Sequence, residues 1–176
     1  MSSDGGISDA VRTRVKTMWG KWRLLSSLLL NKSIPLKIRG TIYRTCLRPV
    51  MLYGSETWAM TKTNQAILEV TEMRLFRWMC GVRLKDQTPN TEVLTRVGLE
   101  KLEIVLRRNR LRWFGHVERR EKENVLKSVE EVHVYGAKPR GRPKNTWMKT
   151  IEDDLKKTGL RKSVCQDRET WRRGIR

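Results

Sequence analysis

The stretch from Lys101 to Arg120 constrains the fold of this chain more than any other. At about 100° per residue, its apolar side chains fall on two faces of a helix, and arginines fill the seams between them. A helix with two apolar faces needs packing partners on both sides, so we expect it to be central to a helical fold. One face holds Leu102, Leu106, Trp113 and Val117, and the other holds Ile104, Leu111 and Phe114.

Apolar residues recur at helical spacing in other parts of the chain as well. The clearest case is an amphipathic helix ending near Leu29, which Ser8 or Asp9 can cap and in which Gly20 is a weak point. A second helix is expected from Ser33 and should kink or end at Pro49. Further helices are predicted over 64–80, 91–97, 124–134 and 145–159. For 124–134 a strand is the alternative. The predicted fold class is therefore all-α, a small multi-helix domain.

The composition changes abruptly at residues 136–144, which read GAKPRGRPK and contain no acidic or large apolar residue. We expect three parts: a helical domain over 1–135, an extended basic linker over 136–144 and a C-terminal helical extension over 145–176. Arg140-Gly141-Arg142-Pro143 resembles the AT-hook, in which extended arginines enter the narrow minor groove of A·T-rich DNA. A plain basic linker is the alternative, and the sequence favours neither.

The formal net charge of +19 indicates a polyanionic partner, because so much like charge repels itself in a compact protein. Nucleic acid is the first candidate and an anionic membrane surface the second, although the apolar cluster 24–30 is too short to span a bilayer. The alternative for the arginine-rich helix is a solvated basic rim whose stems cover apolar surface. The residues predicted to bind nucleic acid are Arg107, Arg108, Arg110, Arg112, Lys138, Arg140, Arg142 and Lys144.

No catalytic or metal-binding pattern stands out, and we expect no cofactor. Glu152, Asp153 and Asp154 invite a nuclease interpretation, but their spacing favours a solvated charge cluster on the polar face of a helix. The three cysteines lie far apart without a CxxC pair, and neither they nor the histidines have zinc-like spacing. With no secretory signal at the start of the sequence, we expect an intracellular protein, nuclear or cytoplasmic and not secreted.

Five segments, taken in order and with their spacing, resemble one family: residues 37–43, 47–58, 73–82, 110–117 and 141–147. Together they are similar to the C-terminal region, the thumb and the part that follows the palm, of non-LTR (LINE-type) retrotransposon reverse transcriptases. The resemblance covers nearly the whole chain. Only the five segments together are specific for this family.

The resemblance implies a thumb-like helical bundle that grips template RNA and the primer duplex. It does not imply a polymerase, because the family's Tyr-x-Asp-Asp hairpin has no counterpart in this sequence. We therefore expect a truncated reverse transcriptase fragment that is not an enzyme and that binds RNA, DNA or their hybrid.

The alternative to this function is a host-adopted protein–protein interaction module, or a remnant with no activity of its own. In that case the surface left bare by the missing palm would bind a protein or a second copy of the chain. The helix that carries Trp22 and the corner from Tyr53 to Trp58 are the expected contact sites.

Overall fold

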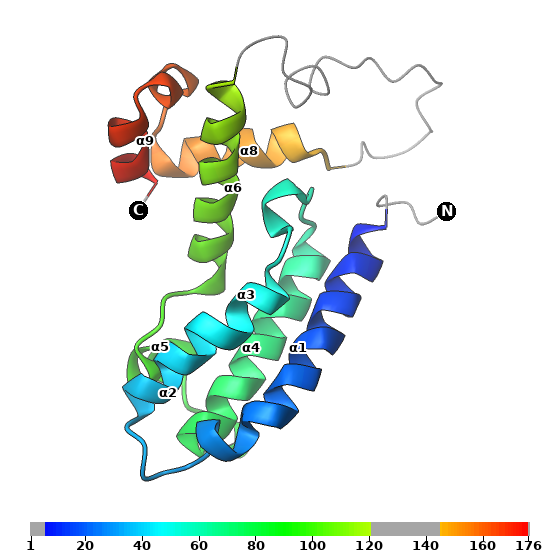
Figure 1. The fold of residues 1–176 in the computed structure, drawn as a ribbon, viewed down its shortest axis with the longest axis vertical. Helices are drawn as coiled ribbons and strands as arrows, with labels where there is room; N and C mark the ends of the chain where they lie inside the picture. The colour runs from blue at the N-terminus through cyan, green and yellow to red at the C-terminus, as the bar shows by residue number, and fades with distance from the viewer. Residues whose placement is uncertain (1–5, 121–144, 176) are drawn as a thin grey trace. The chain divides into compact units, whose positions relative to one another are not determined.

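The computed structural model describes residues 6–120 and 145–175 of the chain (Figure 1). These residues form helices joined by turns and loops and contain no β-strand, which confirms the predicted all-α class. The chain divides into two compact units. The first comprises residues 1–54 and 60–106, and the second comprises residues 55–59 and 107–176.

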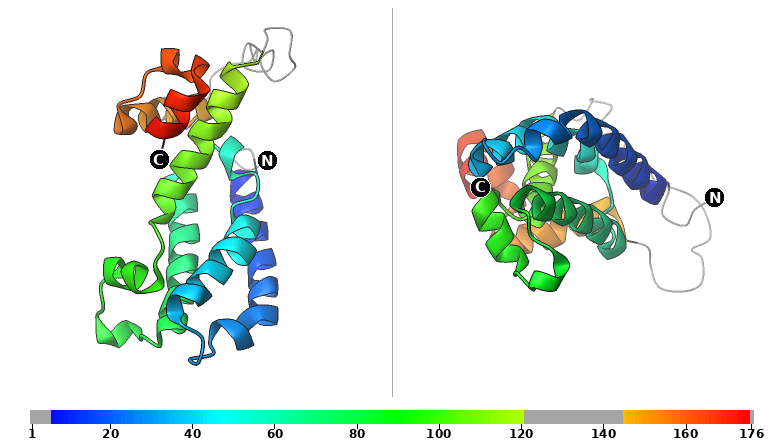
Figure 2. Two further views of the ribbon diagram at one scale, coloured as in Figure 1. Left: turned by 60° about the vertical axis from the view of Figure 1, so that its left-hand side comes forward. Right: turned by 90° about the horizontal axis from the view of Figure 1, so that it is seen from below.

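The first unit is built around two long helices, α1 (Ile7–Leu29) and α4 (Lys62–Cys80), which lie side by side in all views (Figures 1 and 2). They run parallel, because Ser8 Oγ donates a hydrogen bond to Asn64 Oδ1 near their starts and Trp22 contacts Trp78 further along. The other helices of this unit are α2 (Leu36–Ile42), α3 (Arg48–Met51) and α5 (Asn90–Val97), with a 3-10 turn η3 (Leu84–Asp86).

The ends of these helices follow the sequence in most places. The predicted helices 64–80 and 91–97 end at the predicted residues, and Gly81 and Gly98 follow them, each in the left-handed region that favours glycine. The predicted cap of α1 is wrong: Gly6 occupies that position, and no side chain caps it. Pro49 does interrupt its helix as predicted, through a π-helical turn η1 (Tyr43–Leu47) that precedes α3.

Two buried arginines hold the first unit together. Arg39 donates hydrogen bonds to the carbonyl oxygens of Leu29 and Met79. These groups lie at the C-terminal ends of α1 and α4, where carbonyl oxygens have no partner within the helix itself. Arg48 Nε donates to Glu72 Oε1 at 2.8 Å, and the hydroxyl of Tyr43 donates to the same oxygen at 3.0 Å. Burial raises the pKa of Glu72, and Arg48 acts in the opposite direction.

The second unit packs the larger part of α6 (Leu102–Glu118), from residue 107 onward, with the C-terminal helices. These are α8 (Trp147–Thr158), a 3-10 turn η4 (Lys162–Gln166) and α9 (Arg168–Gly174); a short turn η2 (Ser55–Thr57) also belongs to this unit. Thr146 caps α8 as predicted, and Gly159 ends it. The buried core contains Leu111, Phe114, Ile151, Cys165, Trp171 and Ile175.

Trp171 gives the second unit its closest packing. Its indole N–H donates to the carbonyl oxygen of Leu111 at 3.0 Å, and a Cβ at Gly115 would collide with the same indole ring. The sequence did not predict α9, which Asp167 caps by accepting from the backbone N–H groups of Glu169 and Thr170. A hydrogen bond from the Thr170 hydroxyl, together with these backbone hydrogen bonds, lowers the pKa of Asp167.

The division between the units falls within α6, between residues 106 and 107, whereas the sequence predicted a boundary near residue 135. The physical reason is that the C-terminal half of α6 forms a core with α8 and α9. The predicted helix at 124–134 and the basic linker at 136–144 lie outside the described residues.

Candidate nucleic-acid interface

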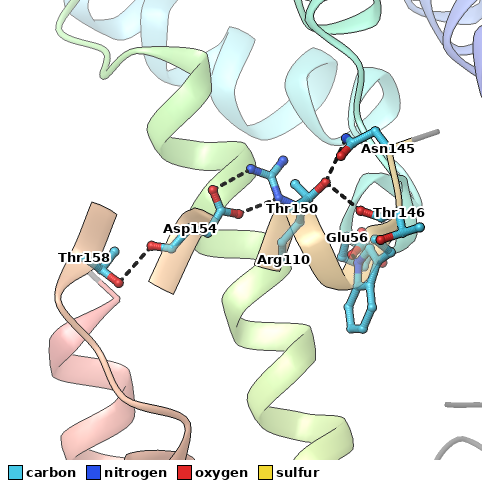
Figure 3. Close-up of polar contacts among 8 residues, drawn as sticks. Glu56, Arg110, Asn145, Thr146, Thr150, Asp154 and Thr158 are labelled. Carbon is cyan, nitrogen blue, oxygen red and sulfur yellow. Dashed lines mark hydrogen bonds and ion pairs between the residues drawn. The ribbon is translucent and has the colours of Figure 1, made fainter. Parts of the chain in front are cut away.

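Arg110, predicted to meet phosphate at the edge of α6, is buried. Its side chain is paired with Asp154 of α8: Nε donates to Oδ2 at 2.7 Å and Nη2 donates to Oδ1 at 3.1 Å (Figure 3). Only 4% of Arg110 and 3% of Asp154 is exposed to solvent. The expectation that Arg110 emerges at the exposed edge of the helix is therefore wrong, because its guanidinium joins α6 to α8.

The same pair corrects the interpretation of the acidic cluster on α8. Glu152 and Asp153 are exposed, as a solvated cluster requires, but Asp154 points inward to Arg110. The backbone N–H of Lys149 donates to the Thr146 hydroxyl and Trp147 donates its indole N–H to the carbonyl oxygen of Glu56, so this helix is anchored near its start. Among the described residues, no group of three or more His, Cys, Asp or Glu could hold a metal ion.

The remaining predicted arginines of α6 differ in exposure: Arg107 and Arg108 are half-buried and Arg112 is exposed. Next to Arg112, the half-buried rings of Trp113 and His116 stack with centroids 5.4 Å apart, and Arg120, just beyond the end of α6, lies within hydrogen-bonding distance of His116. This helix thus offers a small basic and aromatic row. Lys138, Arg140, Arg142 and Lys144 lie outside the described residues.

A second basic surface, which the sequence analysis did not single out, lies on α1. Arg12, Lys16 and Arg23 are exposed and Trp19 is half-buried. With Val15 of the same helix and Ile67 of α4, these four residues line an open hollow of about 450 Å³. We call Arg12, Lys16, Trp19 and Arg23 the α1 basic face.

The signal for the α1 basic face was present in the sequence. Arg12, Lys16, Trp19 and Arg23 follow four-three-four spacing, the spacing of the buried stripe displaced by one residue. The sequence analysis considered only the apolar stripe of this helix, and the charged stripe lies directly beside it. The face is strongly positive, because α1 carries five basic residues and a single acidic one, Asp9.

Asp9 does little to neutralise the α1 basic face. Its carboxylate is 3.9 Å from the guanidinium of Arg12, and both side chains are mostly exposed. Such a pair is worth at most about 1 kcal/mol and is screened by salt. The face therefore keeps an outward positive field that can attract phosphate groups.

A larger groove of about 890 Å³ follows the other side of α4 in the first unit. Val70, Trp78 and Leu84 are exposed apolar residues along it. Four basic and three acidic residues also line this groove. The charged residues that line this groove are Glu69, Glu72, Arg74, Arg77, Arg83, Lys101 and Glu103.

Within residues 6–120 and 145–175, no helix combines the length and the apolar character needed to cross a bilayer.

Comparison with known proteins gives one relative with a curated description. It is transposon-derived. This protein of Caenorhabditis elegans is 31% identical over 91 residues, which cover 48% of the present chain and 32% of the relative. The chain thus spans about a third of the length of that relative. No protein-family model matches the chain, and no solved structure matches it.

Proposed function

We propose that this protein is a reverse transcriptase fragment of LINE-type retrotransposon origin that binds RNA, DNA or their hybrid without catalysing a reaction. The transposon-derived relative supports the coarser part of this origin. The similarity of the sequence to the thumb and post-palm region supports the finer part. The binding itself rests on the α1 basic face, where Arg12, Lys16 and Arg23 are exposed along one side of a helix.

The physical argument for binding is electrostatic. Three cations at helical spacing, held on a rigid helix, can neutralise successive phosphates and release the counterions that surround them. The formal net charge of +19 adds a field that draws any polyanion to the protein. Arg112 of α6 and Arg120, which lies just beyond the end of that helix, supply a second set of exposed cations in the other unit.

The buried arginines have a different role in this proposal. Arg39, Arg48 and Arg110 bind carbonyl or carboxylate groups inside the protein. They stabilise the helices that carry the exposed cations and do not themselves meet phosphate. The buried arginines thus stabilise the scaffold, whereas the exposed arginines bind the ligand.

The proposal is tested by salt-titrated binding to single-stranded RNA, RNA–DNA hybrid, and A·T-rich and G·C-rich duplexes. A log–log slope of about −4 or steeper on the hybrid is expected, because several phosphates are then neutralised together. Binding confined to A·T-rich duplex would assign the interaction to Arg140-Gly141-Arg142-Pro143 instead. Weak binding with a flat salt dependence on every substrate would contradict the proposal.

A further inference from the structure

Three tryptophans form a cluster between α1 and α4 of the first unit. The ring centroids of Trp19 and Trp22 lie 6.5 Å apart, those of Trp22 and Trp78 6.0 Å apart, and those of Trp19 and Trp78 5.6 Å apart. Trp22 is buried, whereas Trp78 is 48% exposed. The buried ring therefore anchors a second ring that presents part of its surface to solvent.

The exposed part of this cluster lies where the two hollows of the first unit adjoin. Trp19 lines the hollow of the α1 basic face, and Trp78 lines the larger groove. Because these two rings are in contact, the aromatic surface and the basic side chains form one continuous surface.

The charges around Trp78 favour a polyanion. Arg74, one turn before Trp78 on α4, and Arg83 beyond the end of that helix are both exposed and line the groove. Of the three acidic residues there, Glu72 is buried against Arg48, whereas Glu69 and Glu103 are half-buried on the walls of the groove. Cations thus lie on both sides of the aromatic cluster, on α1 and on α4.

We propose that this surface binds single-stranded nucleic acid, with a base stacked on the exposed face of Trp78. The phosphates on either side would be held by Arg12, Lys16 and Arg23 and by Arg74. An aromatic ring flanked by cations is the arrangement by which proteins bind single strands without sequence preference. A duplex does not fit this role, because the faces of its bases are already covered by their neighbours. The inference rests on the proposed function and specifies its substrate class.

The test compares two probes of equal charge, an oligothymidylate of about 15 nucleotides and an abasic strand of the same length. Binding of each to the full-length protein is measured by fluorescence anisotropy across a range of salt concentrations. Stacking of one base predicts that the oligothymidylate binds at least about fivefold more tightly at every salt concentration. The difference should not depend on salt, because both probes carry the same phosphates.

Variants assign the stacking to a residue. Trp78→Ala should abolish the advantage of the oligothymidylate over the abasic strand, and Trp78→Phe should retain most of it. The matched control is Tyr53→Ala, another exposed aromatic whose ring is covered by the guanidinium of Arg14 at 4.5 Å, and it should leave the advantage unchanged. Circular dichroism verifies that each variant is folded.

The possible failures are distinguishable. Equal, salt-dependent affinity for both probes would overturn the stacking inference and leave nucleic-acid binding intact. The absence of salt-dependent binding to either probe would overturn both proposals. Self-association of the wild-type protein that Trp78→Ala abolishes would assign this face to a protein contact and would also overturn the inference.

Discussion

The two units of this molecule each bury an arginine against a carboxylate, but they support the pair differently. In the first unit, Glu72 also accepts from the Tyr43 hydroxyl, and Arg48 also donates to the carbonyl oxygen of Glu100 at 3.2 Å. In the second, Arg110 donates both of its described hydrogen bonds to Asp154, and its Nη1 atom has no partner among the described residues. The integrity of the second unit therefore depends far more on one carboxylate.

The units also differ in what their basic helices present to solvent. On α1 the cations of the basic face lie directly beside the buried stripe and stay exposed, whereas α6 has core on two sides and one of its arginines is enclosed. Helix amphipathicity alone determines that the basic side chains of α1 are exposed. The burial of Arg110 on α6 is determined by Asp154, an acidic residue 44 positions further along the chain.

Removal of the carboxylate in the second unit should have the largest effect on stability. Asp154→Ala leaves the guanidinium of Arg110 buried and unpaired, which destabilises a protein by about 3–5 kcal/mol. Urea unfolding followed by circular dichroism measures this loss. The double variant Arg110→Met with Asp154→Leu should recover most of the stability, because it removes both charges. A loss below about 1 kcal/mol for Asp154→Ala would show that the pair does not hold α8 against α6.

The alkylation rate of cysteine should also differ between the two units. Burial, assisted by the carboxylate of Glu118, raises the pKa of Cys165 to about 11, whereas Cys46 of the first unit is exposed. At pH 8 the thiolate fraction of Cys165 is thus about a hundredfold below that of a thiol at its ordinary pKa. Its alkylation rate should increase as the pH rises toward 11, since the thiolate is the reactive form. Peptide mapping after brief iodoacetamide treatment should find Cys46 modified first.

The control for this comparison is the same reaction in concentrated denaturant, where the three cysteines should react at similar rates. Modification of Cys165 as fast as Cys46 in the native protein would contradict the enclosed core of the second unit.

Two glycine substitutions give smaller effects of opposite sign. Gly115→Ala places a methyl group against the indole of Trp171 and should destabilise the second unit by about 1–3 kcal/mol. Gly20→Ala, in the middle of α1, meets no atom within 4 Å and should stabilise the first unit by up to about 1 kcal/mol. Thermal unfolding of both variants is the measurement. A Gly115→Ala variant as stable as the wild-type protein would refute the close contact between α6 and Trp171.

Local sequence patterns were sufficient to predict most helices. The apolar stripe of α1, the cap at Thr146 and the glycine stops at Gly81, Gly98 and Gly159 are all properties of a few neighbouring residues. Helix α9 was missed because seven residues are too few to show a periodic pattern, and its stability comes from burial of Trp171.

The candidate site was harder to predict because exposure is a property of tertiary packing. Arg110 and Arg112 have the same chemistry and lie two residues apart on one helix, yet only Arg110 faces an acid on α8. The α1 basic face, by contrast, required only the spacing of four residues and was present in the sequence. A charged stripe beside an apolar one on the same helix is therefore worth searching for directly.

The most direct test of this account is the salt dependence of binding after loss of the α1 cations. The variant Arg12→Gln, Lys16→Gln and Arg23→Gln is compared on single-stranded DNA with a control that loses three exposed cations elsewhere in the first unit, Lys37→Gln, Arg44→Gln and Lys85→Gln. The α1 variant should bind more weakly, and its log–log slope should be shallower by about 2, because three phosphate contacts are lost. The control should keep a slope near that of the wild-type protein. Equal slopes for the two variants would mean that net charge alone attracts nucleic acid, and would contradict a binding surface on α1.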